Sequence, residues 1–262
     1  MLKIEKYVTA SPEQMEMIIE GMRNPMNSWD RMDSHICEAQ CNDHAGCEGC
    51  PYDVTTCPLD ADCYETHYMI GPNDHQLMMS LAKGGPVHAK YRRMMPIWVT
   101  ITAPLYWWKE FDTYKVGTVA NSCSTMHKIH EKEFTLEDFS CEYLISDWAD
   151  DPLRKGIIFP CSPMGHLMGT IASLNLCRLK FLEAKKKPMK DESKRADLVK
   201  KYWWQMIQLL PSSYNQTRTV FMNYEVAYAM RKDRRFHKLD EWHVFCDFLE
   251  SLPYSEVSAP EG

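Results

Sequence analysis

The sequence predicts an α+β fold, built by a single domain that spans residues 1–262 and carries a cysteine-rich insert at about residues 34–66. Three observations support this prediction. Apolar residues recur at helical spacing in several segments, and residues 95–106 alternate as a strand does. The composition, with 45% hydrophobic and 25% charged residues, is that of a folded globular protein. A chain of this length can bury one sizeable core.

The first predicted helix begins at the sequence Ser11-Pro12-Glu13-Gln14. Serine can cap the first amides of a helix, proline suits the first turn, and Gln14 can complete a capping box. The apolar stripe that follows has helical spacing and consists of Met15, Ile18, Ile19 and Met22.

The insert at 34–66 shows little periodicity, and six cysteines lie close together in it. Cys47 and Cys50 form a C-x-x-C pair, which can place two thiolates on one metal ion. We expect a zinc or iron–sulfur site with Cys37, Cys41, Cys47 and Cys50 as ligands. The spacing fits no standard zinc module, so a set of redox disulfides and unligated thiols remain the alternatives.

After the insert, a helix is predicted from Asn73 to Gly84-Gly85, where glycine favours a helix end. The strand 95–106 should end at Pro104, and residues 107–114 have helical spacing before a polar turn at 117–125. Further helices are predicted at 165–182, 193–210, 217–232 and 239–252, with 136–148 helical in part. The lysine-rich residues 185–188 should form a solvated hairpin between two of them.

Charge and hydropathy exclude several classes of protein. The net charge of −6 and a sequence pI near 5.9 do not provide the broad basic surface that nucleic acid binding requires. The longest apolar stretch, residues 94–108, is interrupted by two prolines and is shorter than the ~20 residues of a membrane helix. The N-terminus lacks the order of charges and apolar residues found in a secretory signal. We therefore expect a cytoplasmic protein without nucleic acid or membrane partners.

Residues 102–124 carry the most informative pattern. A predicted strand ends at Ala103-Pro104, a helix follows that contains Glu110, and Thr113-Tyr114-Lys115 leads into a polar turn with Thr118, Asn121 and Ser124. This order resembles the signature region of the flavin-dependent thymidylate synthases, with one residue inserted near Ala120. In that family a glutamine occupies the place of Glu110, and Arg-His-Arg occupies the place of Thr113-Tyr114-Lys115.

The resemblance implies that phosphate contacts have moved to other cations, because the arginines of that family's triplet face the flavin and nucleotide phosphates. A guanidinium forms bidentate contacts with phosphate that threonine and tyrosine cannot replace. Lys90, Arg92 and Arg93 precede the strand, where the family has a histidine-containing loop, and His88 matches that histidine. The alternative is that these cations are ordinary surface residues of a loop.

The C-terminal third resembles the same family more weakly. There a Leu-Pro step precedes a helix that ends in a nucleotide-contacting arginine, and Leu210-Pro211 followed by a helix ending near Arg231 repeats this layout. Arg231 is then the candidate for the phosphate or uracil contact. Its alternative role is to bind carbonyl groups at the helix end. We expect Arg218, Arg234 and Arg235 to be solvated.

As the resemblance implies, the protein would methylate deoxyuridylate to dTMP, using methylenetetrahydrofolate, FAD and NADPH as reductant. The partners would be a pyrimidine deoxynucleotide and folate, and the fold a small, mainly antiparallel sheet with long helices, assembled as a homotetramer with sites between subunits. The catalytic residues would be Glu110, Lys115 and Ser124; those binding FAD would be His88, Lys90, Arg93, Lys115, Thr118 and Asn121; and those binding substrate would be Glu110, Ser124 and Arg231. The competing hypothesis is a non-catalytic or altered-substrate member of the fold, which binds another nucleotide or anion and has a metal-binding insert.

Overall fold

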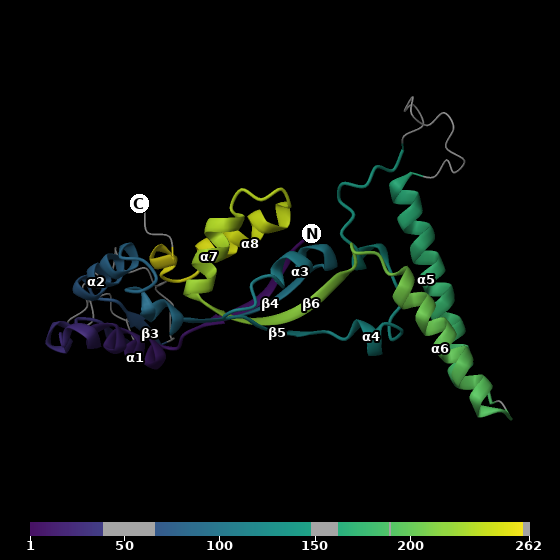
Figure 1. Cartoon of the computed structure of the whole chain (residues 1–262), viewed down its shortest axis with the longest axis horizontal. Helices are drawn as coiled ribbons and strands as arrows, with labels where there is room; N and C mark the ends of the chain where they lie inside the picture. Colours follow the sequence, from purple (N-terminus) through teal and green to yellow (C-terminus); the bar gives the residue numbers. More distant parts are fainter. Residues whose placement is uncertain (39–65, 148–161, 189, 259–262) are drawn as a thin grey trace. The chain divides into compact units, whose positions relative to one another are not determined.

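The computed structural model describes residues 1–38, 66–147, 162–188 and 190–258 (Figure 1). The strands are β1 (Lys3–Thr9), β2 (His35–Glu38), β3 (Thr66–Met69), β4 (Pro96–Pro104), β5 (Val119–Ser122) and β6 (Asn215–Asn223). The helices are α1 (Pro12–Arg23), α2 (Pro72–Lys83), α3 (Leu105–Phe111), α4 (Thr125–Lys128), α5 (Pro163–Lys186), α6 (Glu192–Leu209), α7 (Tyr224–Arg234) and α8 (Asp240–Ser251). Short 3-10 helices are η1 (Asn24–Met26), η2 (Trp29–Arg31), η3 (Lys90–Arg93), η4 (Leu136–Asp138) and η6 (Ser255–Ser258).

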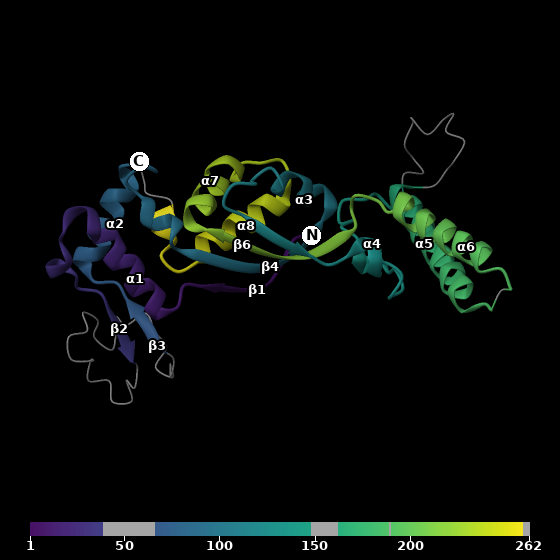
Figure 2. The ribbon, with the colours of Figure 1, turned by 60° about the horizontal axis from the view of Figure 1, so that its bottom comes forward.

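Among the described residues, the main sheet has four strands in the order β1-β4-β6-β5. Hydroxyl pairs join β4 to β6: Thr100 lies 2.9 Å from Thr219, and Thr102 lies 2.7 Å from Thr217. Because the residue number rises along β4 as that of its partner on β6 falls, these two strands are antiparallel. A separate antiparallel ribbon pairs β2 with β3, with His35 opposite Met69 (Figure 2). The predicted α+β class, with a small antiparallel sheet and long helices, is confirmed.

The chain forms two compact units. The first unit contains Met1–Glu5, Thr100–Thr113 and Asn121–Thr219, and the second contains Lys6–Val99, Tyr114–Ala120 and Val220–Gly262. The expectation of a single domain stays a prediction.

In the first unit, α5 and α6 lie side by side as a helical pair (Figure 1). Both helices have a capped start: Ser162 Oγ accepts from Gly165 N at 3.1 Å, and Asp191 Oδ1 accepts from Ser193 N at 3.1 Å. The predicted helices at 165–182 and 193–210 are thereby confirmed. Lys185 and Lys186 belong to the last turn of α5 and are exposed, as is Lys187. The core of this pair consists of buried Ile129, Phe134, Phe139, Leu167, Leu174, Phe181 and Met206.

In the second unit, α1 begins as its sequence predicts. Ser11 caps the helix, and its side chain and that of Gln14 form the reciprocal bonds of a capping box. The predicted stripe of Met15, Ile18, Ile19 and Met22 is buried. The helices α7 and α8 pack on each other, and α8 buries Trp242, Phe245, Cys246, Phe248 and Leu249.

The predicted helix at 217–232 is wrong over residues 217–223, which belong to strand β6, whereas the rest of the range lies in α7. Alternating side chains explain the difference: Val220 and Met222 are buried, whereas Thr217 and Thr219 pair with threonines of β4. These long-range pairs override the local helical spacing. The strand passes directly into α7 at Asn223, whose Oδ1 accepts from Val226 N at 3.1 Å. Within the described part of 136–148, the predicted helical structure is limited to η4.

In the part of the chain that the structure describes, no helix combines the length and the apolar character needed to cross a bilayer.

Candidate functional site

Residues 102–124, which resemble the family's signature region, are called the signature segment. This segment starts at the end of β4 and finishes at the N-cap of α4. Pro104 ends the strand and immediately precedes α3, as predicted. At the other end, Ser124 Oγ accepts from His127 N at 3.0 Å and so caps α4. The residues of the segment divide between the two units: Tyr114–Ala120 belong to the second unit and the flanking residues to the first.

Tyr114, which replaces the histidine of the triplet, contacts the last residue of α7. Arg234 Nε donates to the Tyr114 hydroxyl at 3.0 Å, and the guanidinium carbon lies 5.5 Å from the centre of the tyrosine ring. The same guanidinium lies 5.0 Å from the ring centre of Trp242. Burial raises the pKa of Tyr114, and the hydrogen bond from Arg234 opposes this effect. The phenol is therefore neutral at physiological pH and can both donate and accept a hydrogen bond.

Gly117 holds the polar turn against the start of α7. Its φ of +82° lies in the left-handed region, which favours glycine. A Cβ atom at this position would lie 2.8 Å from Val226 Cγ2, so a side chain would also push against the helix. Glycine thus lets the turn pack closely on α7. Thr118 closes the turn by donating its hydroxyl hydrogen to the carbonyl of Tyr114.

The basic segment η3 also packs on α7, through Arg92. The Arg92 guanidinium is 1% exposed; it donates to the Ala82 carbonyl at 3.1 Å and lies 3.6 Å from the Glu225 carboxylate. It also lies 4.7 Å from the ring centre of Tyr228. Helix α7 therefore contacts both the signature turn, through Val226 and Arg234, and η3, through Glu225 and Tyr228.

The candidate cations Lys90, Arg93 and Lys115 of the second unit are exposed. Lys90, Arg93 and Lys115 have side chains in solvent, and none of them forms a hydrogen bond or ion pair with another described residue. His88 is exposed as well, and its ring lies close to Gly84, where an added Cβ atom would come within 3.1 Å. These side chains remain available for an anionic ligand, since no carboxylate of the described chain neutralises them.

Arg231 is committed to contacts within the protein. Its Nη1 donates to Ser258 Oγ at 3.0 Å and to the Ser255 carbonyl at 3.3 Å, and its Nη2 lies 3.3 Å from Glu250. The side chain is 16% exposed. Arg231 thus holds α7 to η6 and α8, and its bond to the Ser255 carbonyl is a contact of the kind that its alternative role implies. The helix ends three residues later, at Arg234.

The expectation that Arg218 and Arg234 are solvated is wrong. Besides the contacts of Arg234 given above, Arg218 lies 2.8 Å from Asp112 Oδ1 and 4.3 Å from the ring centre of Trp108, with 15% of its side chain exposed. It also donates to Gln216 Oε1 at 2.9 Å. The partners of both arginines are distant in sequence, so helical spacing and local charge could not reveal them. Arg235 is paired with Asp247 and 39% exposed, so it is close to the expected state.

The candidate residues of the first unit lie along the same segment. Glu110 is half-buried on α3, whereas Asn121 on β5 and Ser124 are exposed. Gln216 supports the turn between them, because its Nε2 donates to the Cys123 carbonyl at 3.0 Å. Cys123 N in turn donates to the Thr217 carbonyl at 2.9 Å. Strand β6 thus fixes the backbone just before Ser124.

Of the four predicted metal ligands, Cys37 is the one in the described part of the chain. It is buried on β2. Cys41, Cys47 and Cys50 lie outside the described residues. Within the described ranges, no group of three or more His, Cys, Asp or Glu side chains is placed to hold a metal ion. The cysteine metal site therefore stays a prediction.

The chemistry of the available side chains fits the phosphate groups of FAD and of a nucleotide. Lys90, Arg93 and Lys115 of the second unit offer positive charge without a carboxylate partner in the described chain, whereas Thr118 already donates its hydroxyl hydrogen to the Tyr114 carbonyl. Asn121 of the first unit offers an amide group. Charged donors of this kind form the stronger hydrogen bonds to phosphate oxygens.

Together, the antiparallel sheet, the paired long helices and the signature turn on α7 define the class of fold: it is the fold of the flavin-dependent thymidylate synthases, as the sequence resemblance implied. No family model and no curated protein matches the sequence.

Among solved structures, the chain is similar to thymidylate synthase X from Helicobacter pylori in two crystal structures with FAD and dUMP. The first shares 13% identity over 99% of this chain and 96% of that chain, with a TM-score of 0.51. The second shares 13% identity over 99% and 97%, with a TM-score of 0.50. A UMP/dUMP methylase from Streptomyces cacaoi, bound with 5-Br dUMP, shares 11% identity over 96% of this chain and 88% of that chain, with a TM-score of 0.46. The likeness to the two Helicobacter pylori structures shows a common fold.

Proposed function

We propose that this protein is a flavin-dependent methyltransferase that converts deoxyuridylate to dTMP, with methylenetetrahydrofolate as the carbon donor and NADPH as the reductant. The observation that carries the proposal is the fold shared over 99% of the chain with enzymes solved with FAD and dUMP. The signature turn, packed on α7 with exposed cations beside it, supports it from within the chain. A cytoplasmic location belongs to the same proposal.

In this proposal the exposed donors of the second unit hold the anionic parts of FAD. Lys90, Arg93 and Lys115 would neutralise phosphate oxygens, and His88 would donate a hydrogen bond. Of the other two residues that the resemblance implies, Asn121 belongs to the first unit, and Thr118 already donates its hydroxyl hydrogen to the Tyr114 carbonyl. FAD, when bound, supplies the redox chemistry, and the protein contributes binding and orientation. Glu110 and Ser124 would orient the nucleotide, and Lys115 would balance the charge near the reacting ring. These residues replace the two guanidinium forks that the triplet lacks.

Arg234 is a better candidate for the nucleotide contact than Arg231, which sequence reasoning favoured. Arg234 is the residue at which α7 ends and is bonded to Tyr114 of the signature segment. Arg231 instead holds α7 to the residues that follow α8. We therefore assign Arg234 to the substrate and give Arg231 a positioning role.

The proposed homotetramer finds support in an unusual helix of the first unit. One side of α5 is buried, yet the exposed residues Met168, Ala172, Leu176 and Leu179 form a second apolar stripe at spacings of four, four and three. Leu176 is 54% and Leu179 58% exposed. Contact with another copy of the chain would bury this stripe, as burial of apolar surface drives association.

The purified full-length protein tests the function in two steps. Absorbance near 450 nm and release of FAD on denaturation would demonstrate flavin binding, and formation of dTMP from dUMP, methylenetetrahydrofolate and NADPH would demonstrate the reaction. Arg234→Gln should weaken dUMP binding, whereas the adjacent Arg235→Gln should not, because Arg235 pairs with Asp247 on the protein surface. Absence of both flavin binding and turnover would refute the proposal.

A second candidate is a protein that binds a nucleotide without turnover. Thr113 and Tyr114 favour it, since they replace an arginine and a histidine that face phosphates in the resembling family. This candidate predicts nucleotide binding without dTMP formation. The proposed metal in the cysteine-rich insert is tested separately, by measuring zinc and iron in the same preparation.

A further inference from the structure

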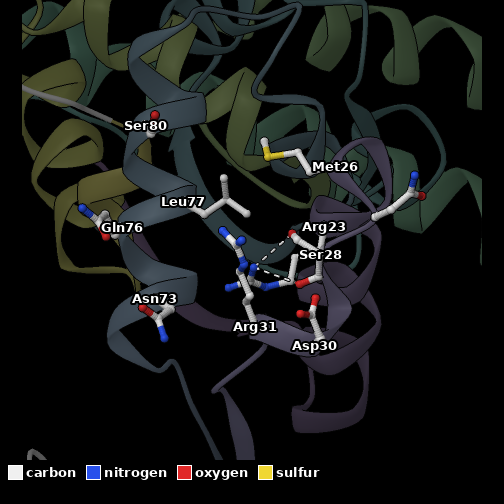
Figure 3. A pocket seen from close by; sticks show the side chains of 10 residues that line it. Arg23, Met26, Ser28, Asp30, Arg31, Asn73, Gln76, Leu77 and Ser80 are labelled. Atoms are coloured by element: carbon white, nitrogen blue, oxygen red, sulfur yellow. Dashed lines mark hydrogen bonds between the residues drawn. The ribbon is translucent and has the colours of Figure 1, made fainter.

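A polar pocket of about 840 Å³ lies in the second unit, between α2 and the segment that follows α1 (Figure 3). Its walls come from the end of α1, from η1 and η2, and from the exposed side of α2. Its volume falls in the range of small-molecule sites, which is about 300–1,000 Å³. None of the residues assigned above to flavin or nucleotide lines this pocket.

Arg23 is the buried basic residue of the pocket wall. Its side chain is 3% exposed, and its Nε binds the fully buried carboxylate of Asp74. Its Nη1 donates to both the carbonyl and the hydroxyl oxygen of Ser28, each at 3.2 Å. Asp74 is itself held by Ser34, whose hydroxyl donates to it at 2.6 Å. The guanidinium is therefore fixed in place before any ligand arrives.

The third nitrogen of this guanidinium, Nη2, is buried and has no hydrogen-bond acceptor in the described part of the chain. A buried donor without a partner costs about 1–3 kcal/mol, and folded proteins rarely leave one unsatisfied. Asp74 does not accept a hydrogen bond from Nη2: its Oδ1 accepts from Nε, and its Oδ2 accepts from the Ser34 hydroxyl and from the amides of Asp33 and Ser34. An acceptor brought by a ligand would satisfy Nη2.

A second guanidinium reaches the same pocket from η2. Arg31 is exposed and makes no side-chain hydrogen bond or ion pair with another described residue. Figure 3 shows Arg23 and Arg31 both extending into the space beside α2, with Asn73 and Gln76 on the helix. Asp30 is the one acidic side chain among the lining residues of the described chain. Two guanidinium groups and the three amides of Asn27, Asn73 and Gln76 thus offer a set of donors that is suited to oxygen atoms of an anion.

We propose that this pocket binds the oxyanion group, phosphate or carboxylate, of a small ligand, at a site separate from the flavin and nucleotide site. The exposed Arg31 provides an accessible guanidinium group, and the fixed Arg23 provides Nη2, the donor that lacks a partner. Guanidinium groups bind both kinds of oxyanion in bidentate fashion. Because Nη2 is covered, its bond to the anion requires a small movement of neighbouring side chains.

Phenylglyoxal labelling of the full-length protein, read by mass spectrometry, tests the site directly. Inorganic pyrophosphate and citrate serve as the phosphate and carboxylate probes. Either probe should slow the labelling of Arg31, and the stronger of the two identifies the chemical class. The surface residue Arg195 on α6, which pairs with Glu192, serves as the unprotected reference. Equal labelling of Arg31 with and without both probes overturns the proposal.

A binding measurement complements the labelling. Arg31→Gln should weaken binding of the protecting probe about tenfold or more, the loss expected for one charged hydrogen bond, whereas Arg195→Gln should not. Arg31 is exposed, so its replacement should leave folding intact. Arg93→Gln separates this site from the flavin site: protection of Arg31 should persist in that variant. Loss of Arg31 protection in Arg93→Gln, or an unchanged affinity in Arg31→Gln, contradicts the inference.

Discussion

Arg234 donates its Nε hydrogen to the hydroxyl of Tyr114 at 3.0 Å, and this bond joins the end of α7 to the residue that replaces a histidine in the signature triplet. Replacing Tyr114 by phenylalanine removes the acceptor and keeps the ring. We expect the free energy of unfolding to fall by about 0.5–1.5 kcal/mol, the usual net value of one hydrogen bond. Urea denaturation measures this change, and an unaltered midpoint would show that the bond adds nothing to stability.

Substitution of Arg231 should mainly lower the stability of the protein, whereas substitution of Arg234 should mainly weaken the binding of dUMP. Arg231→Gln breaks the contacts to Ser255, Ser258 and Glu250, so the unfolding free energy should fall by about 1–2 kcal/mol with dUMP affinity nearly unchanged. Arg234→Gln should instead raise the Kd for dUMP about tenfold or more. Calorimetric titration of both variants decides between the two arginines; the reverse pattern would return the nucleotide contact to Arg231.

Gly117 and Gly85 form a matched pair for testing the turn on α7. Both have a positive φ, of +82° and +83°, but an added Cβ atom meets Val226 at Gly117 and meets nothing within 4 Å at Gly85. Gly85→Ala should cost about 1–2 kcal/mol for the left-handed backbone alone, and Gly117→Ala should cost more. Thermal unfolding measures both. Adding Val226→Ala to Gly117→Ala should recover the difference, and equal losses in the two single variants would rule out the clash.

The buried Asp74–Arg23 pair should make stability depend on acid. Burial acts to raise the pKa of Asp74, but hydrogen bonds from Ser34 and Arg23 outweigh it, so the pKa lies below its ordinary value. The ionised carboxylate therefore stabilises the fold above about pH 4, the value in the unfolded chain, and this stabilisation is lost as the pH falls through the lower folded pKa.

Asp74→Asn should accordingly lose about 3–5 kcal/mol near neutral pH, because Arg23 is left without its counter-charge. As the pH is lowered from 5 through the folded pKa of Asp74, the unfolding free energy of the variant should also fall less than that of the wild type. Denaturation curves across this range provide the comparison. A parallel pH dependence in both proteins would show that another carboxylate is responsible.

The apolar stripe on α5 predicts a change in assembly. Leu176→Glu places a charge in the stripe, and sedimentation velocity should reveal a smaller particle than the wild type, since burying an unpaired charge is costly. His166→Glu, an exposed position of the same helix outside the stripe, should leave the particle size unchanged. An unchanged size in Leu176→Glu would remove the stripe from the interface.

Much of the local structure could be predicted from the sequence, because the signals act over a few residues. The capping box of Ser11 and Gln14, the strand end at Pro104 and the helix ending before Gly84 are examples. The strand β6 could not, since its threonines are ordered by partners more than a hundred positions away. Helical spacing in one segment carries no information about such partners.

The sequence predicted which segment forms the candidate site, but it did not predict the contacts of the arginines. The order of residues 102–124 located the polar turn. A helix after Leu210-Pro211 was also expected, and the structure has α7 there. Arg231 was favoured because it lies near the expected helix end, yet the helix continues to Arg234. Arg218 and Arg234 could not be placed, because their aromatic partners Trp108, Tyr114 and Trp242 come from other elements.

Asn223 is both the last residue of β6 and the N-cap of α7, so no linker residue separates the strand from the helix. A tag or an extra residue inserted there would rotate the helix and displace every side chain that it presents to the turn. The exposed lysines after α5 have no such constraint. For attaching a fluorophore or an affinity peptide, the neighbourhood of Lys187 is therefore the tolerant position and Asn223 the forbidden one.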